Sequence, residues 1–327
     1  MIRSARRLAL AATSLLLVMT AAACGGDNVN TATPDGSQSG PVKISVGSMP
    51  VVTSVALTLG REKGFFSDAG LDLTITPTEP PSMVPSLLSN NIQFAFLNPP
   101  AILIARSNGV PVIGVETAAR YDKDPAKAAV ALMVLKNGAI SAPADLVGKT
   151  IAVDALGQMP HLSVLNALRS SGVDPADIKF TELPFPSMAA ALQSGQVAAA
   201  VATEPFMTLI TSKGGAVLLP ASAGMPPEMP QSLWFTSEEF FKNNKDTVKK
   251  FREAIDRSQT YAQEHPDEVR AILPTYTKVD AAMADKIQLP NYAPGYTAEQ
   301  WNAWYKILKT EGYLKKDTNP SDAYIPQ

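Results

Sequence analysis

The chain contains 327 residues, of which 46% are hydrophobic and 18% are charged, and its formal net charge is −2. This composition is typical of a globular protein with one large or two ordinary domains, and it excludes a fibrous or disordered chain. The mildly acidic balance argues against a nucleic-acid-binding protein.

The first 24 residues have the pattern of an export signal. Arginines make the start basic, residues 8–23 are apolar, and small residues precede Cys24. We expect residues 1–23 to be a lipoprotein signal peptide and Cys24 to be the lipid-attachment point. The protein would then be exported and lipid-anchored on the outer face of the cell membrane. An uncleaved membrane anchor is the alternative.

Residues 24–40 are rich in Gly, Ser, Thr and Asn, a composition typical of a flexible tether. We therefore expect the folded part to begin near Pro41. Because Cys24 is the only cysteine, the chain can form neither an intrachain disulfide nor a cysteine-based metal site. No later apolar run approaches the roughly 20 residues that span a bilayer.

From Pro41 onwards, short apolar runs alternate with helical patterns, as expected of an α/β fold with mainly parallel sheets. In the first half we predict strands at residues 42–47, 71–76, 92–96 and 111–116, and helices at 52–64 and 100–109. The second half repeats this order, with strands at 150–155, 178–183, 197–202 and 216–220, and helices at 160–172 and 205–215.

After Gln231 the pattern changes. Residues 232–241 indicate a strand that leads into a helix. Residues 245–265 place apolar side chains at helical spacing and predict an amphipathic helix with a charged outer face. Further helices are predicted at 266–276, 280–287 and 297–312.

The tripeptide PSM occurs twice, at the start of two similar segments. When residues 81–100 are aligned with 186–205, at an offset of 105, seven of the twenty positions are identical. The leading strands keep nearly the same spacing. We interpret this as one structural unit used twice, with the segments ending in different residues, Asn98 in the first and Glu204 in the second.

Several segments, in this order and spacing, resemble the nitrate/sulfonate/taurine group of bacterial ABC-transporter substrate-binding lipoproteins. These segments are LGREKGFFSDAGLDL, LLSNNIQFAF, LVGKTIAV, ALQSGQVAAAVATEPF and FREAIDRSQTYAQEHPDEVR. The resemblance covers residues 42 to about 313.

The resemblance implies a two-lobed periplasmic-binding-protein fold. Each lobe would be a mainly parallel sheet flanked by helices, and two crossover strands would join the lobes. Lobe 1 would comprise residues 41–120 and 237–327, and lobe 2 residues 121–236. The ligand would be held in the cleft between them.

Ligands of parallel α/β sheets bind at the carboxyl ends of strands, where loops lead into helix N-termini. These loops and the segments near them contain the candidate ligand-binding residues Ser48, Met49, Thr53, Ser82, Asn98, Pro99, Arg120, Gln158, Met159, His161, Phe185, Ser187, Thr203, Glu204 and Trp234.

Several of these candidates have structural alternatives. Ser82 and Ser187 are also suited to capping helices, as is Glu204. His161 could donate to a ligand oxygen or be a histidine without a ligand, and Arg120 could pair with an anionic ligand or with an acidic neighbour at the hinge. Core packing is the usual role of a residue such as Trp234.

The resemblance implies a solute receptor that works with an ABC permease and its cytoplasmic ATPase. The expected ligand is a sulfonate or another small organic anion, with taurine and nitrate in the same group; a pyrimidine-like or aromatic heterocycle is the alternative. We expect a monomer without cofactor or metal. An enzyme like the pyrimidine-precursor synthases that share this fold is the second class, but those depend on histidine and cysteine chemistry, so we predict no enzyme. A structural surface protein is the third class of function.

Overall fold

The computed structural model describes residues 40–277 and 279–326, and Gly40–Gln327 forms one compact unit. The predicted signal peptide, Cys24 and residues 24–39 of the predicted tether lie outside the described residues. In the part of the chain that is described, no helix is both long enough and apolar enough to cross a membrane.

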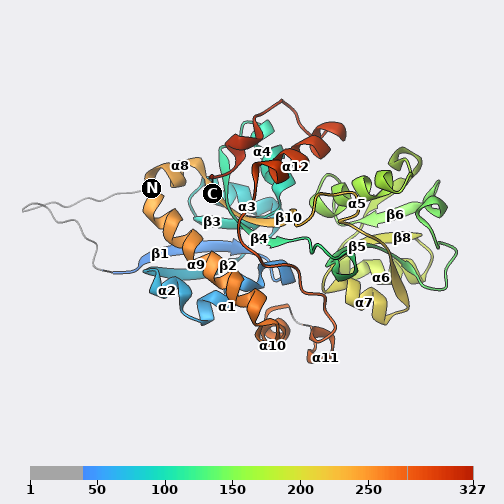
Figure 1. The fold of residues 1–327 in the computed structure, drawn as a ribbon, viewed down its shortest axis with the longest axis horizontal. Coiled ribbons are helices and arrows are strands. Elements are labelled where there is room, and N and C mark those ends of the chain that lie inside the picture. Colours follow the sequence, from blue (N-terminus) through green and yellow to red (C-terminus); the bar gives the residue numbers. More distant parts are fainter. Residues whose placement is uncertain (1–39, 278, 327) are drawn as a thin grey trace, which may run out of the picture. The chain divides into compact units, whose positions relative to one another are not determined.

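The first sheet contains five strands in the order β2-β1-β3-β10-β4 (Figure 1). Their bounds are Leu71–Pro77 (β2), Val42–Ser48 (β1), Phe94–Leu97 (β3), Pro230–Ser237 (β10) and Val112–Arg120 (β4). β1 is parallel to β2 and β3, whereas β10 runs antiparallel to β3 and β4. All eight residues of β10 are buried, because it has a strand on either side and helices over the sheet.

The second sheet repeats this arrangement in the order β7-β6-β8-β5-β9. Its strands are Lys179–Glu182 (β7), Thr150–Val153 (β6), Ala199–Thr203 (β8), Val130–Leu135 (β5) and Gly215–Pro220 (β9). β6 is parallel to β7 and β8, whereas β5 runs antiparallel to β8 and β9. We did not predict β5.

We call the part of the chain built on the first sheet lobe 1 and the part built on the second sheet lobe 2. The predicted α/β fold with two lobes is confirmed, but the sheets are mixed rather than mainly parallel. The physical reason is that each sheet accepts one strand, β10 or β5, that arrives from the other lobe in the reverse direction. β10 therefore belongs to lobe 1, although we had predicted residues 230–236 in lobe 2.

The internal repeat corresponds to equivalent elements of the two lobes. Helix α3 (Pro80–Leu88) and helix α6 (Phe185–Gln193) have the same length and lie 105 residues apart, as the two PSM segments do. Each helix leads to the third strand of its sheet, β3 or β8. Adding 105 to the bounds of β3 gives residues 199–202, which lie within β8.

Nine helices accompany lobe 1 in the described residues. Besides α3, they are α1 (Val55–Glu62), α2 (Phe65–Asp68), α4 (Pro99–Ser107), α8 (Glu238–Asn243), α9 (Lys245–Glu264), α10 (Pro266–Thr277), α11 (Ala281–Ala284) and α12 (Ala298–Thr310). The long helix α9 crosses the first sheet (Figure 1). Its buried residues form the apolar face that we predicted. Phe251 on this face stacks on Phe94 of β3.

Lobe 2 contains helix α6 together with α5 (Met159–Ser170) and α7 (Phe206–Ser212). α5 is buried along most of its length, and α6 and α7 share an apolar cluster with β5 and β8. The chain passes between the lobes twice, through residues 121–129 and 221–229. These two links are the segments about which the lobes could move relative to each other.

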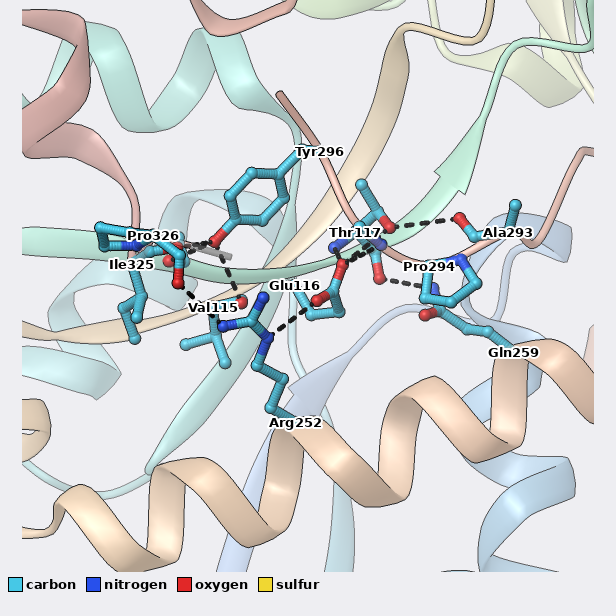
Figure 2. Close-up of polar contacts among 12 residues, drawn as sticks. Val115, Glu116, Thr117, Arg252, Gln259, Ala293, Pro294, Tyr296, Ile325 and Pro326 are labelled. Atoms are coloured by element: carbon cyan, nitrogen blue, oxygen red, sulfur yellow. Dashed lines mark hydrogen bonds and ion pairs between the residues drawn. The ribbon is translucent and has the colours of Figure 1, made fainter. Parts of the chain in front are cut away.

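A buried acid in β4 fastens the C-terminal segments to lobe 1. Figure 2 shows Glu116 accepting hydrogen bonds from the Thr117 amide and from Arg252 Nε of α9. Gly295 N also donates to Glu116, and the Arg252 guanidinium reaches the Pro326 carbonyl, 3.1 Å away. The carboxyl of Asp256, one turn after Arg252, lies beside Glu116. Burial, followed by the charge of Glu116, raises the pKa of Asp256 to about 7.

Candidate functional site

A cavity of about 320 Å³ lies where the strand ends of both lobes meet. It is lined from lobe 1 by Met49, Val51, Thr53, Pro80, Pro81, Phe96, Leu97, Asn98, Gln231 and Ser232, and from lobe 2 by Asp154, Ala155, Gln158, Met159, Pro160, Phe185 and Thr203. Its volume is that of a small-molecule site, and most of its wall is apolar.

Seven of the predicted candidates line this cavity: Met49, Thr53, Asn98, Gln158, Met159, Phe185 and Thr203. They come together because β1, β3, β6, β7 and β8 direct their carboxyl ends to the same place, and each is followed by a loop or a helix start. The structure thus shows that these residues share one cavity. Their contact with a ligand stays a prediction.

One hydrogen bond crosses the cavity directly. Asn98 caps α4, where its Oδ1 accepts from the Ala101 amide at 2.9 Å. Its Nδ2 is then free to donate to Gln158 Oε1 of lobe 2, at 3.3 Å. Asn98 therefore fixes a helix of lobe 1 and holds the cap residue of α5 in lobe 2 at the same time.

Four candidates lie beside the cavity without lining it. Ser82 and Ser187 are exposed in the first turns of α3 and α6, and their amides bond to Glu79 and Pro184 carbonyls within those turns. Ser48 is buried, and its hydroxyl lies 3.5 Å from Tyr276 Oη. Pro99 is buried as the first residue of α4. The side chains of Ser82 and Ser187 point to solvent because only one stripe of each helix is buried.

Arg120 is occupied by the backbone of its own lobe. Its Nε donates to the Ala293 carbonyl at 2.9 Å, and its Nη2 donates to the carbonyls of Pro294 and Gly295. Burial lowers the pKa of Arg120, while Glu228 and Glu116 oppose that shift. The guanidinium thus fastens the segment before α12 to the end of β4 and does not line the cavity.

His161 lies behind the cavity wall, inside lobe 2. It is 3% exposed, its Nδ1 accepts from the Gly157 amide at 3.0 Å, and its ring meets Phe180 edge to face. Burial lowers the pKa of His161 to about 4, although Glu182 acts in the opposite direction. His161 is therefore neutral at physiological pH and shapes the loop before α5.

Glu204 forms hydrogen bonds with residues of both lobes and does not line the cavity. Its carboxylate accepts from the amide and the hydroxyl of Thr208 in α7, at 3.0 and 2.9 Å. It also accepts from the Gln288 amide of lobe 1 at 3.1 Å. Burial raises the pKa of Glu204, and these hydrogen bonds counteract the shift. The carboxylate is satisfied by the protein itself.

Trp234 belongs to the core of lobe 1. It is fully buried, and its ring packs against Phe96 with centroids 5.3 Å apart. Phe96, which we did not predict, lines the cavity in its place. Trp234 packs into the apolar cluster that also contains Phe96 and Phe251, so its side chain belongs to the core of lobe 1.

The remaining unpredicted lining residues include three polar ones, Asp154, Gln231 and Ser232. Asp154 follows the last residue of β6, and the strand-end rule would have identified it if we had not extended this strand to residue 155. The strand-end rule could not have identified Gln231 and Ser232. They lie at the start of β10, which reaches the cavity only because it is antiparallel to β3.

Asp154 is the one ionisable residue among the described residues that line the cavity. Burial raises the pKa of its carboxyl to about 6, and the charge of Glu182 adds to the shift. Hydrogen bonds from the amides of Ala155 and of Asp154 itself oppose it. No group of three or more His, Cys, Asp or Glu side chains within residues 40–277 and 279–326 is arranged to hold a metal ion.

Comparison with known proteins gives one consistent picture. Residues 53–269 match a family described as NMT1/THI5 like. The chain is 24% identical over 331 aligned positions to the formylaminopyrimidine-binding protein of Halalkalibacterium halodurans, covering 95% of this chain and 96% of that protein. It is 29% identical over 181 positions to the taurine-binding periplasmic protein of Escherichia coli, covering 55% and 54%.

A solved structure shows the same fold. The periplasmic aliphatic sulphonate binding protein SsuA from Escherichia coli superposes with a TM-score of 0.74 at 18% sequence identity. The match covers 86% of this chain and 97% of the other.

Proposed function

We propose that this chain, which belongs to the NMT1/THI5-like family, is an extracytoplasmic solute-binding protein of an ABC importer. The observation that carries the proposal is the cavity of about 320 Å³, to which both lobes contribute wall residues while only two links join them. A small organic solute would be bound there and delivered to a membrane permease driven by a cytoplasmic ATPase.

Binding in such a cavity favours the arrangement in which both walls contact the solute. The solute adds contacts to Phe96 in lobe 1 and to Phe185 and Met159 in lobe 2, so the closed arrangement gains free energy that an open one lacks. The permease would then recognise the closed protein. This mechanism requires one solute per chain, and we propose that the protein is a monomer.

The ligand we predicted is a sulfonate or another small organic anion, with a pyrimidine-like or aromatic heterocycle as the alternative. The named relatives include proteins for taurine, aliphatic sulphonate and formylaminopyrimidine. The shared scaffold therefore supports both classes, and the side chains of the cavity must distinguish them.

We also propose that the protein binds its solute without converting it. The two histidines of the chain support this, because His161 is buried and held by the Gly157 amide, while His265 lies at the end of α9, outside the cavity lining. Neither is placed to act on a bound solute. Asp154 is the one ionisable side chain among the described lining residues, and the conversion assay below tests whether it acts as a base.

A thermal-shift and calorimetry experiment tests the receptor proposal. The full chain is expressed in a bacterial host and screened with taurine, an alkanesulfonate, nitrate and an aminopyrimidine. A solute at 100 times its Kd stabilises the folded protein by about 2.7 kcal/mol, which gives a clear rise in Tm. Conversion of the bound solute, followed by mass spectrometry, would overturn the proposal, as would the absence of any stabilisation.

A variant of the cavity wall makes the test specific. Phe185→Ala should weaken binding at least tenfold, because a buried aromatic side chain contributes about 1.5–3 kcal/mol of apolar contact. Leu88→Ala is the matched control, since Leu88 is 47% exposed at the end of α3 and does not line the cavity. Equal loss in both variants would place the solute elsewhere.

We propose further that Cys24 carries a lipid that anchors the protein to the outer face of the cell membrane. The basic start, the apolar residues 8–23 and the single cysteine support this. Cys24→Ala should release the protein into the soluble fraction or leave the precursor unprocessed. Unchanged membrane fractionation together with unchanged mass of the mature chain would contradict the anchor.

A further inference from the structure

Three side chains in the cavity wall end in buried atoms that lack a hydrogen-bond partner among the described residues. These atoms are Asp154 Oδ1, Gln231 Oε1 and Ser232 Oγ. Gln231 and Ser232 are only 1% and 4% exposed. Leaving a buried polar atom unpaired costs about 1–3 kcal/mol, so three in one cavity are best explained by a ligand that completes them.

The chemistry of these atoms is that of hydrogen-bond acceptors. Gln231 donates through Nε2 to the Arg120 carbonyl at 3.0 Å, and because a carbonyl only accepts, the free atom of this amide must be the oxygen Oε1. The Asp154 carboxyl is ionised above its pKa and then only accepts. The Ser232 hydroxyl can accept or donate.

The cavity lacks the groups that an anion would require. None of the described residues that line it is Lys, Arg or His, and the one ionisable side chain, Asp154, would repel a negative charge. The two basic residues among the predicted candidates cannot supply a positive charge to the cavity. Arg120 bonds to backbone carbonyls, and His161 is neutral.

The lobe 1 helices that begin at the cavity do not replace those cations. An anion at a helix N-terminus binds to free backbone N–H groups, and proline has none. α3 begins with Pro80 and Pro81, and α4 begins with Pro99 and Pro100. The next amide of α4, that of Ala101, is already bonded to Asn98 Oδ1.

From these observations we infer that Asp154, Gln231 and Ser232 recognise an amino or amidinium group of the solute. The N–H groups of the solute donate to Asp154 Oδ1 from the lobe 2 side and to Gln231 Oε1 from the lobe 1 side. Phe96, Phe185 and the two methionines of the wall contact its organic remainder. The inference rests on the proposed receptor function and deepens it by assigning the solute class.

Pairs of solutes that differ only in an amino group test this assignment. We choose 4-aminopyrimidine against pyrimidine, and butylamine against butanol, with binding to the full chain measured by calorimetry at pH 7.5. We expect an amino-bearing member to bind at least tenfold more tightly than its partner. Equal or tighter binding of the amino-free partners would overturn the inference while leaving the receptor proposal intact.

Variants of the three residues give a second, independent measurement. Asp154→Asn should weaken binding of the amino-bearing solute at least thirtyfold, and Ser232→Ala should weaken it about threefold to tenfold. Asp177→Asn is the matched control, because it removes an exposed carboxylate of lobe 2 that does not line the cavity. We expect that variant to bind within threefold of the unmodified chain.

The Tm of the solute-free protein distinguishes a binding role from a structural one. A carboxylate that is kept buried for a ligand destabilises the empty protein, so Asp154→Asn should raise the Tm without solute. A lower Tm would assign Asp154 a structural role and overturn the inference. If no solute of the panel binds and the Tm of Asp154→Asn is not raised, both the inference and the receptor proposal fail.

Discussion

At the scale of single residues, Asp154 shows a conflict between stability and binding. Its carboxyl is buried enough for the pKa to rise to about 6, and the two backbone amides that bond to it only partly offset that burial. A protein selected for stability alone would be expected to replace such a group with a neutral one. Retaining it is understandable if a positively polarised solute group neutralises the charge, as the assigned solute class would do.

The raised pKa of Asp154 predicts a pH dependence of binding. Above about pH 6 the carboxyl is ionised and accepts N–H groups; below this value it is protonated and loses the charge. Affinity for an alkylammonium solute such as butylamine should therefore fall by about tenfold between pH 7.5 and pH 5, since the attraction of unlike charges is lost. Calorimetry at both values measures this.

The Asp154→Asn variant is the control for that pH dependence. Glu182, the other titratable group that acts on Asp154, remains in the variant. If the variant shows the same decrease in affinity between pH 7.5 and pH 5, then another group is responsible.

The buried acids around β4 predict a pH dependence of folding stability. Because the pKa of Asp256 is raised to about 7, the folded protein retains a proton that the unfolded chain releases near pH 4. Stability should therefore decrease as the pH rises from 4 to 7 and then change no further from this group. Asp256→Asn should increase the free energy of unfolding at pH 8 and have little effect at pH 4.5, measured with urea. Destabilisation at pH 8 would contradict this account.

At the scale of elements, close packing of α1 on α9 depends on one glycine. A Cβ placed on Gly60 would lie 1.8 Å from Ser258 Oγ and 2.5 Å from Ser258 Cβ. Ser258 is itself fully buried and bonds to the Ala254 carbonyl of its helix. The two helices can therefore approach this closely only while residue 60 lacks a side chain.

Gly60→Ala should accordingly destabilise the protein, although alanine favours a helix. The overlap forces α1 away from α9, and overpacking of this kind costs about 1–3 kcal/mol. Combining Gly60→Ala with Ser258→Gly removes the overlapping atoms. The double variant should therefore lose less stability than the sum of the losses of the two single variants. Urea unfolding of the two single variants and the double variant measures the coupling. Simple additivity would show that the contact does not limit the helix separation.

At the scale of the whole folded unit, two hydrogen bonds join the lobes on the side of the cavity. They connect Asn98 to Gln158 and Glu204 to the Gln288 amide. Glu311, the residue that follows α12, also approaches lobe 2, where it forms an ion pair with Arg169 of α5. These polar contacts add to an apolar cluster that includes residues of both lobes, such as Trp304 of α12 and Leu162 of α5, and solute binding can reinforce or replace them.

Removing one of these contacts should shorten the residence of the solute. Glu204→Ala loses the bond to the Gln288 amide, and since Glu204 does not line the cavity, its loss should act through the lobes. We expect dissociation to become about twofold to tenfold faster with little change in association, as measured by stopped flow. Thr208→Val removes only the hydroxyl bond to Glu204 within lobe 2. An equal effect in both variants would argue against a role in joining the lobes.

Most elements were predictable because their patterns are local. The strands β1, β2 and β9 and the helices α5, α9 and α12 lie within a few residues of the predicted ranges, since apolar spacing and proline or glycine boundaries are read from neighbouring residues. β5 was missed, and β10 was assigned to the wrong lobe. The error for β10 concerns the partner of a strand, which depends on residues about 140 positions away in the chain, whereas β5 is a local apolar run, VALMVL, that we did not assign.

The sequence by itself determined the α/β class, the repeat of one unit in two lobes and seven of the side chains that share the cavity. These follow from periodicity, from the 105-residue offset and from the rule that loops at strand ends form sites. Only the tertiary structure decided which polar side chains of the cavity wall keep an atom without a hydrogen-bond partner. Gln231 and Ser232 reach it from an antiparallel strand, whereas Arg120, His161 and Glu204 find partners within the protein. Whether a polar side chain has a hydrogen-bond partner depends on its neighbours in three dimensions, and no local sequence pattern specifies those neighbours.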